Sequence, residues 1–131
     1  MIPRPIWKRP CYNLYLRVVY ILIFISDIPQ VHVISNSYTV NLGNTVSLQC
    51  VISADPIHTN VYWKKTVNSV SSYVNINSNN NKYGGATLSS PSLEIYNTVT
   101  SDEGFYVCYA TNSVGTGHSS QTYLDVVGSK F

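Results

Sequence analysis

The side chains that could carry chemistry in this chain are three histidines and six carboxylates. His32, His58 and His118 are far apart in the sequence, and none has a cysteine or an acidic residue at metal-ligand spacing. Glu94 and Asp102 come nearest to an acid–base pair, but alternation with apolar neighbours points Glu94 toward solvent. The sequence contains neither a G-x-S-x-G nucleophile motif nor a phosphate-binding loop. We therefore expect no catalytic residue, no metal and no small-molecule cofactor.

Thiol chemistry is the other possibility, because the chain has three cysteines. Cys11 lies in the N-terminal segment, so Cys50 and Cys108 make one possible pair in the remainder. A bridge between them would indicate an oxidising, extracellular compartment. Two reduced, buried thiols in a cytosolic domain are the alternative.

The first 26 residues have the layout of a targeting segment. Residues 1–27 carry four basic residues against one acidic residue, a net charge of +3, and the apolar run Val18–Ile25 follows the basic start. This run is shorter than the roughly 20 residues of a membrane span. We interpret residues 1–26 as a signal peptide or a signal anchor, although bulky Phe24 before Ser26 makes a poor cleavage site. An incorrectly assigned start of the sequence is the remaining alternative.

Cleavage and anchoring agree on the compartment, because positive charge before the apolar run keeps the N-terminus in the cytosol and sends the following residues outside. Residues 28–131 carry four lysines against five acidic residues, a net charge of −1. This part of the chain therefore has no basic face for phosphates, and we expect no nucleic-acid partner.

After the leader, the chain has the pattern of short strands. Apolar and polar residues alternate in the runs 46–52, 61–64, 93–95, 105–110 and 124–126, which indicates strands with one buried face. Turn residues are expected to separate strands at Gly43-Asn44, Asp55-Pro56, Gly84-Gly85 and Gly115-Thr116-Gly117. Many short strands at this spacing predict an all-β fold, an antiparallel sandwich or barrel.

Three features of the sequence combine into a specific pattern. Cys50 lies on an alternating strand, Trp63 follows 13 positions later, and Cys108 lies 58 positions beyond Cys50 at the end of the run Asp-Glu-Gly-Phe-Tyr-Val-Cys. Together these features resemble the immunoglobulin superfamily, and within it the intermediate (I-set) type. The resemblance covers residues 31–127 and implies an immunoglobulin-like antiparallel β-sandwich. Residues 128–131 are then a C-terminal remnant or linker.

The resemblance also implies roles for individual residues. Cys50 and Cys108 would bridge the two sheets, with Trp63 packed on the bridge and Leu93 in the core. Tyr106, two residues before the second cysteine, would make the tyrosine-corner hydrogen bond.

A salt bridge is implied between Asp102, at the turn entering strand F, and Lys82, at the start of strand D. If that pair is exposed, it contributes about 0–1 kcal/mol to stability.

Strand parity predicts a binding surface on the outer face of strands C and F. Tyr62, Phe105 and Tyr109 would point outward, with Lys64 as a charged rim, and such an aromatic patch suits a protein partner. Coverage of these aromatics by a C′ strand or by a neighbouring domain is the alternative. No asparagine lies in an Asn-x-Ser/Thr sequon, so we expect no N-linked sugar on any face.

The predicted function is an extracellular binding module for protein–protein recognition or cell adhesion, secreted or at the cell surface. The partner would be a protein, homophilic or heterophilic, with further Ig domains possible in a longer product. Residues 112–117 resemble the F–G hairpin of adhesion and receptor proteins. This hairpin and loop 55–59 form a competing binding site, which we expect to offer no large anchor. The alternatives are a secreted immune-recognition protein for foreign surfaces and an intracellular structural I-set domain.

Overall fold

The computed structural model describes residues 26–77 and 81–128. Except for Ser26, the expected leader lies outside the described residues, and so do residues 129–131 of the expected C-terminal remnant. Within the two described ranges, no helix is long and apolar enough to cross a membrane.

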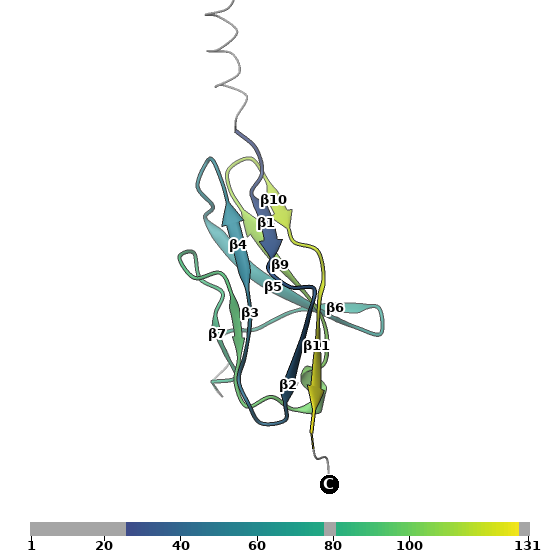
Figure 1. The fold of residues 1–131 in the computed structure, drawn as a ribbon. Coiled ribbons are helices and arrows are strands. Elements are labelled where there is room, and N and C mark those ends of the chain that lie inside the picture. The colour runs from purple at the N-terminus through teal and green to yellow at the C-terminus, as the bar shows by residue number, and fades with distance from the viewer. Residues whose placement is uncertain (1–25, 78–80, 129–131) are drawn as a thin grey trace, which may run out of the picture.

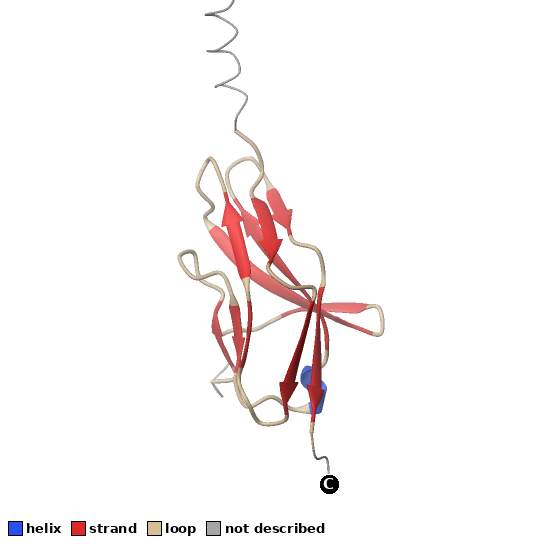
Figure 2. Cartoon of the chain, viewed as in Figure 1, coloured by secondary structure: helices blue, strands red, loops and turns tan. Residues whose placement is uncertain are grey.

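Short strands make up most of the described chain (Figure 2). The elements are β1 (Gln30–Val33), β2 (Ser37–Asn41), β3 (Val46–Leu48), β4 (Cys50–Ser53), β5 (Asn60–Val67), β6 (Val70–Tyr73), β7 (Tyr83–Gly85), β8 (Leu93–Ile95), the 3-10 helix η2 (Thr100–Asp102), β9 (Gly104–Thr111), β10 (Thr116–His118) and β11 (Thr122–Val127).

The strands pack as two layers (Figure 1). One layer has the order β2-β11-β9-β5-β6, with β10 paired to β9; the other combines β3-β8-β7 with the β1-β4 pair. All pairings are antiparallel except β2 with β11, which is parallel. This architecture confirms the predicted all-β, immunoglobulin-like sandwich. The described chain begins at the end of the sandwich that holds the β9–β10 turn, and β11 runs to the opposite end (Figure 1).

The alternating run 46–52 is divided into β3 and β4 at Gln49. The Cys50 N–H donates to the Ser92 hydroxyl at 3.0 Å, and the Gln49 N–H donates to the Tyr38 hydroxyl at 3.0 Å. Side-chain hydroxyl groups therefore accept these backbone N–H groups at the point where the pairing of β3 with β8 ends, after Leu48.

The predicted break at Gly84-Gly85 is wrong, because both glycines lie within β7 and pair with β8. A Cβ on Gly85 would collide with the carbonyl oxygen of Ser92, and its φ is +71°. Gly117, also expected in a break, lies in β10, where a Cβ would collide with the Pro29 carbonyl oxygen. These glycines permit close approach of two backbones within the sandwich.

The core lies between the layers and contains all three predicted core residues. Trp63, Tyr106 and Leu93 are fully buried, and the Trp63 indole N–H donates to the Pro91 carbonyl at 2.8 Å. The other hydrophobic residues of this cluster are Val31, Val40, Val46, Leu48, Cys50, Ala86, Ile95, Cys108, Ala110, Leu124 and Val126.

Candidate interaction surface

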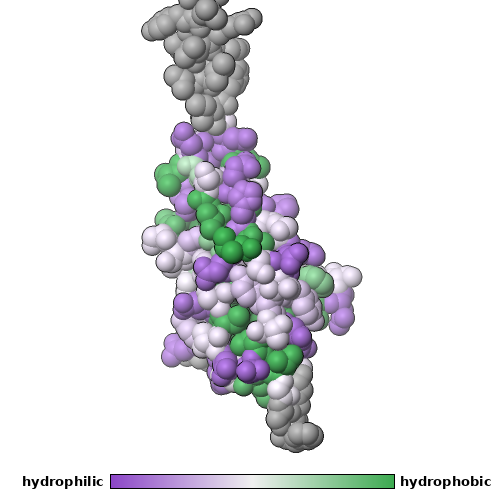
Figure 3. All heavy atoms as spheres, viewed as in Figure 1, coloured by the Kyte–Doolittle hydropathy of each residue, from purple (hydrophilic) through white to green (hydrophobic). Residues whose placement is uncertain are grey.

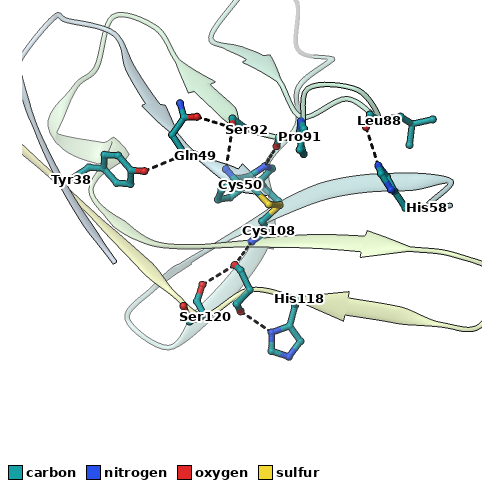
Figure 4. Close-up of a disulfide and its surroundings, with 12 residues drawn as sticks. Tyr38, Gln49, Cys50, His58, Leu88, Pro91, Ser92, Cys108, His118 and Ser120 are labelled. Carbon is teal, nitrogen blue, oxygen red and sulfur yellow. Dashed lines mark hydrogen bonds between the residues drawn. A yellow bond between two sulfur atoms is a disulfide. The ribbon is translucent and has the colours of Figure 1, made fainter. Parts of the chain in front are cut away.

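A disulfide joins the two layers behind the candidate surface. Cys50 of β4 and Cys108 of β9 are bridged, with Cα atoms 6.6 Å apart, and Trp63 of β5 lies opposite Cys108 in the register. Hydroxyl groups accept backbone hydrogen bonds on both sides of the bridge: the Ser92 hydroxyl accepts the Cys50 N–H (Figure 4), and the Ser119 hydroxyl accepts the Cys108 N–H, each at 3.0 Å. The side chains that point outward from β5 and β9 therefore lie over a core that this disulfide cross-links.

A second anchor is the Asp102 carboxylate at the end of η2. This carboxylate accepts hydrogen bonds from the Lys82 ammonium at 2.6 Å and from the Val99 N–H at 2.8 Å. The backbone carbonyl of Asp102 accepts a hydrogen bond from the Tyr106 hydroxyl at 2.6 Å. The Asp102 and Lys82 side chains are only 5% and 20% exposed. The contribution of about 0–1 kcal/mol to stability that is expected of an exposed ion pair therefore does not apply to them. Burial, reinforced by the neighbouring charges of Tyr83 and Asp102, raises the pKa of the Tyr106 phenol well above its usual range.

On the outward side of β5, β6 and β9, three tyrosines form what we call the aromatic cluster: Tyr62, Tyr73 and Tyr109. The Tyr62 and Tyr109 rings stack with centroids 4.9 Å apart and planes 3° from parallel. The Tyr73 ring lies 5.5 Å from Tyr62, and the His118 ring lies 5.6 Å from Tyr109. Coverage by the C′ strand, here β6, is only partial, because all four of its residues are exposed and Tyr73 is 68% exposed.

Lys64 does not form the predicted charged rim. Its ammonium lies over two rings of the aromatic cluster, 4.8 Å from the Tyr73 centroid and 5.2 Å from the Tyr109 centroid. Cation–π attraction therefore holds the charge within the cluster. No carboxylate of the described residues lies within salt-bridge distance of it.

The predicted patch is divided, because Phe105 lies apart from the aromatic cluster. Phe105 is opposite Thr66 of β5 and Tyr123 of β11, and its ring meets the Tyr123 ring edge-on with centroids 4.9 Å apart. Both rings line a groove of about 480 Å³, which we call the Phe105 groove. Its other lining residues are Thr66, Val67, Asn68, Thr100, Ser101, Glu103 and Gly104.

The competing loop end is held together by the buried side chain of Asn112. Its amide NH₂ donates to the carbonyls of Asp27 and Pro56 at 2.8 and 2.9 Å. The expectation that this end offers no large anchor is wrong, because Ile57 is 69% exposed and Val114 is 50% exposed. The face drawn in Figure 3 has no continuous apolar surface: its apolar residues form separate green patches with polar residues between them.

Several titratable side chains of the domain make structural hydrogen bonds. His58 Nε2 and His118 Nδ1 lie 2.9 and 2.8 Å from backbone carbonyl oxygens, and Glu94 accepts the Tyr96 hydroxyl at 2.6 Å. This bond to Glu94 is the main reason that the Tyr96 pKa is raised. Across residues 26–77 and 81–128, no three His, Cys, Asp or Glu side chains are grouped so that they could hold a metal.

Sequence reasoning missed Tyr73, His118 and Tyr123 as neighbours of the predicted patch. One signal could have found Tyr73: Asn68 and Ser69 stand between two valines, a pattern typical of a two-residue hairpin turn. Both residues have positive φ, 51° and 67°, and the hairpin pairs Lys64 with Tyr73.

Comparison with known proteins agrees with this architecture. The immunoglobulin-domain family model matches residues 28–112. The chain is 34% identical over 87 residues to the tyrosine-protein phosphatase Lar of Drosophila melanogaster, a match that covers 66% of the chain but 4% of that relative.

Two of the solved structures that are similar to this chain come from Drosophila. The N-terminal Ig1-2 module of the Drosophila receptor protein tyrosine phosphatase DLAR shares 29% identity and a TM-score of 0.60, covering 80% of this chain and 50% of that one. Extracellular domains 3–5 of Drosophila OTK share 25% identity and a TM-score of 0.61, covering 76% of this chain and 32% of that one. With the family match spanning more than half of its residues, the chain belongs to the immunoglobulin domain family.

Proposed function

We propose that this domain is an extracellular, non-catalytic binding module that recognises a protein partner in adhesion or receptor signalling. The observation that carries the proposal is the aromatic cluster, which stands outside the core on β5, β6 and β9. Tyrosine side chains give a large contact area for little lost conformational entropy, which is why they concentrate in binding hot spots. The chain contains no Asn-x-Ser/Thr sequon, so N-linked sugar does not compete for this face.

The relatives support an extracellular location and a setting among further Ig domains. One similar structure is described as a two-Ig module of a receptor, and another as extracellular domains. The Cys50–Cys108 bridge supports the same location, because disulfides persist in oxidising compartments.

The binding face can be tested by comparing two double variants of the secreted chain. Fluorescent tetramers of wild type, Tyr62→Ser/Tyr109→Ser and Ile57→Ser/Val114→Ser are applied to cultured animal cells and to bacterial cells. We expect wild type to bind animal cells, the tyrosine variant to lose binding with little change in melting temperature, and the loop variant to retain binding. Retention by the tyrosine variant together with loss by the loop variant would place the site at the loop end.

The second candidate function is recognition of foreign surfaces by a secreted protein through that loop end. The exposed side chains of Ile57 and Val114, on loops fixed by Asn112, favour this candidate. Preferential binding to the bacterial cells, abolished in the loop variant, would select it over the adhesion role.

Export is tested separately. Expressed in animal cells, the chain should appear in the medium or on the outer surface, and deletion of residues 1–26 should abolish this export. Wild-type protein that stays wholly cytosolic would contradict both the signal-peptide and the signal-anchor interpretations.

A further inference from the structure

We propose that the protein partner binds as an extended strand added to the free edge of β6, with an acidic side chain of that strand set against Lys64. The inference rests on the proposed function, because it states how the partner of the aromatic cluster is held. Two independent features support it: the unpaired backbone along β6, and the charge that the tyrosine rings hold beside that strand.

β6 is the last strand of its layer, and β5 is its only neighbour among the strands of the described residues. Figure 1 shows the β5–β6 hairpin at the margin of the sandwich. Natural proteins protect edge strands by several means, among them charged side chains and proline. The sequence of β6 is Val-Ser-Ser-Tyr, and all four residues are exposed. The side chains of β6 provide neither form of protection, so this edge is open to strand addition.

The register of the hairpin shows which backbone groups of β6 point outward. The two-residue turn at 68–69 makes Val70 a hydrogen-bonded partner of β5. The Val74 N–H also points to β5, where it donates to a backbone carbonyl at 2.9 Å. Because hydrogen bonding alternates along an antiparallel strand, the N–H and C=O groups of Ser71 and Tyr73 point away from β5. These four groups have no hydrogen-bond partner among the described residues.

An antiparallel strand added at this edge would exchange hydrogen bonds with both Ser71 and Tyr73. Residues that lie opposite each other in a sheet have their side chains on the same face. The two partner residues opposite Ser71 and Tyr73 would therefore project their side chains on the outward face, beside the aromatic cluster. The added strand extends the tyrosine-bearing layer by one strand and brings its own side chains to the proposed binding face.

The ammonium of Lys64 selects an acidic strand. It lies 4.8 Å from the centroid of the Tyr73 ring, which belongs to β6. The ammonium groups of Lys65 and Lys82 already donate to oxygen atoms of the chain. Within the part of the chain that the structure describes, Lys64 has no such oxygen partner. A partner carboxylate would supply one, and because two rings already order this charge, it would do so at a reduced entropic cost.

A glutamate opposite Tyr73 on the added strand is well placed to reach this charge. Its backbone would lie two strand spacings from that of Lys64, roughly 10 Å, and two long side chains on one face together span that distance. A second copy of this chain would bring no carboxylate here through its own β6, which contains no acidic residue. The charge therefore favours a different, acidic protein segment over self-pairing.

Panning a phage library of random nonapeptides against the secreted chain tests the proposal. We expect the enriched peptides to carry a glutamate or an aspartate within a run of β-branched or aromatic residues. For a synthetic copy of the best peptide, Kd should rise about tenfold or more when its acid is replaced by the amide, or when the domain carries Lys64→Gln. The two changes together should cost no more than either alone, because each removes the same contact.

Strand addition also predicts an alternating response to methylation of the peptide backbone. N-methylation of a residue whose N–H faces β6 should raise Kd by about tenfold or more, whereas methylation of the intervening residues should have little effect. Ser71→Pro removes a donor from the other side of the same contact. The domain should stay folded, because proline is tolerated where an edge N–H faces solvent. If thermal melts show that Ser71→Pro unfolds, the methylated peptides still decide, since they leave the domain unchanged.

The strand addition would be overturned by a library that yields no enriched peptide, by enriched peptides without an acid, or by equal sensitivity to methylation at successive residues. A wild-type dimer in sedimentation equilibrium that Ser71→Pro abolishes would overturn it in favour of pairing between two copies. Each of these results leaves the proposed function standing if the tetramers bind animal cells through the tyrosines. Tetramers that fail to bind count against the proposed function itself, and the peptide measurements still decide whether β6 accepts a strand.

Discussion

Replacing Lys82 with methionine is the perturbation that best tests the anchoring of β9 by Asp102. Methionine keeps most of the apolar stem of lysine and removes the ammonium that lies 2.6 Å from the Asp102 carboxylate. That carboxylate is 5% exposed, so it stays buried, with the Val99 N–H still donating to it. The variant therefore leaves an acid that water cannot readily solvate.

The expected cost lies between two limits. A hydrogen bond to a charged group contributes about 1.5–3 kcal/mol, and breaking a fully buried pair costs about 3–5 kcal/mol. Two features favour the lower part of this span: the Lys82 side chain is 20% exposed, and the Lys65 ammonium also interacts electrostatically with Asp102. Burial lowers the pKa of Lys65. We expect a loss of about 2 kcal/mol, which lowers the melting temperature by roughly 10 °C in a domain of this size.

A double-mutant cycle measured by chemical denaturation isolates the pair. Lys82→Met, Asp102→Asn and the combined variant should give a coupling energy above about 1 kcal/mol. Lys64→Met is the matched control, because it removes a lysine that interacts with aromatic rings instead of a buried carboxylate; it should cost less than about 1 kcal/mol. A coupling energy below about 0.5 kcal/mol would mean that the pair behaves as an exposed one and would refute the role given to burial.

Three further predictions concern the core. Cys50→Ala should cost about 2–5 kcal/mol by removing the bridge to Cys108, and non-reducing peptide mass spectrometry should find that bridge in the secreted protein. Trp63→Ala should cost about 3–5 kcal/mol, and Tyr62→Ala, on the opposite face of β5, well under half as much; equal losses in thermal melts would contradict the strand parity. Above the ordinary tyrosine pKa of 10.0, the unfolded state loses a proton that the buried Tyr106 keeps, so stability should fall with rising pH. Tyr106→Phe should reduce that alkaline slope by up to about 1.4 kcal/mol per pH unit in denaturation curves.

The sequence is sufficient to predict the fold and the disulfide because both depend on strand parity and chain spacing. Cys50, Trp63 and Cys108 all occupy inward positions of alternating strands, and the structure buries all three. The Lys82–Asp102 pair follows from the family resemblance, through the position of each residue relative to a strand start. Its burial is not predictable in this way, because it depends on how η2 packs against the sheet.

The arrangement of the outward side chains depends on register, which the alternation of one strand does not determine. Strand parity correctly assigns Lys64 to the outside, but its place over two rings depends on the hairpin that brings Tyr73 beside it. Parity alone also puts Phe105 in the same patch as Tyr109. Phe105 lies four residues before Tyr109 on β9, however, and its ring contacts the Tyr123 ring instead.

Core and surface are nevertheless determined together. Since successive side chains of a strand point to opposite faces, burial of Trp63 obliges Tyr62 and Lys64 to face outward, and burial of Cys108 does the same for Tyr109. A slip of one residue between β5 and β9 would put the tyrosines in the core and remove the tryptophan from the disulfide. The disulfide therefore stabilises the sandwich, while the inward positions of Trp63 and Cys108 fix the β5–β9 register that assembles the aromatic cluster. For this reason, substitutions of the outward tyrosines should change binding with little change in folding, whereas loss of the bridge should remove both.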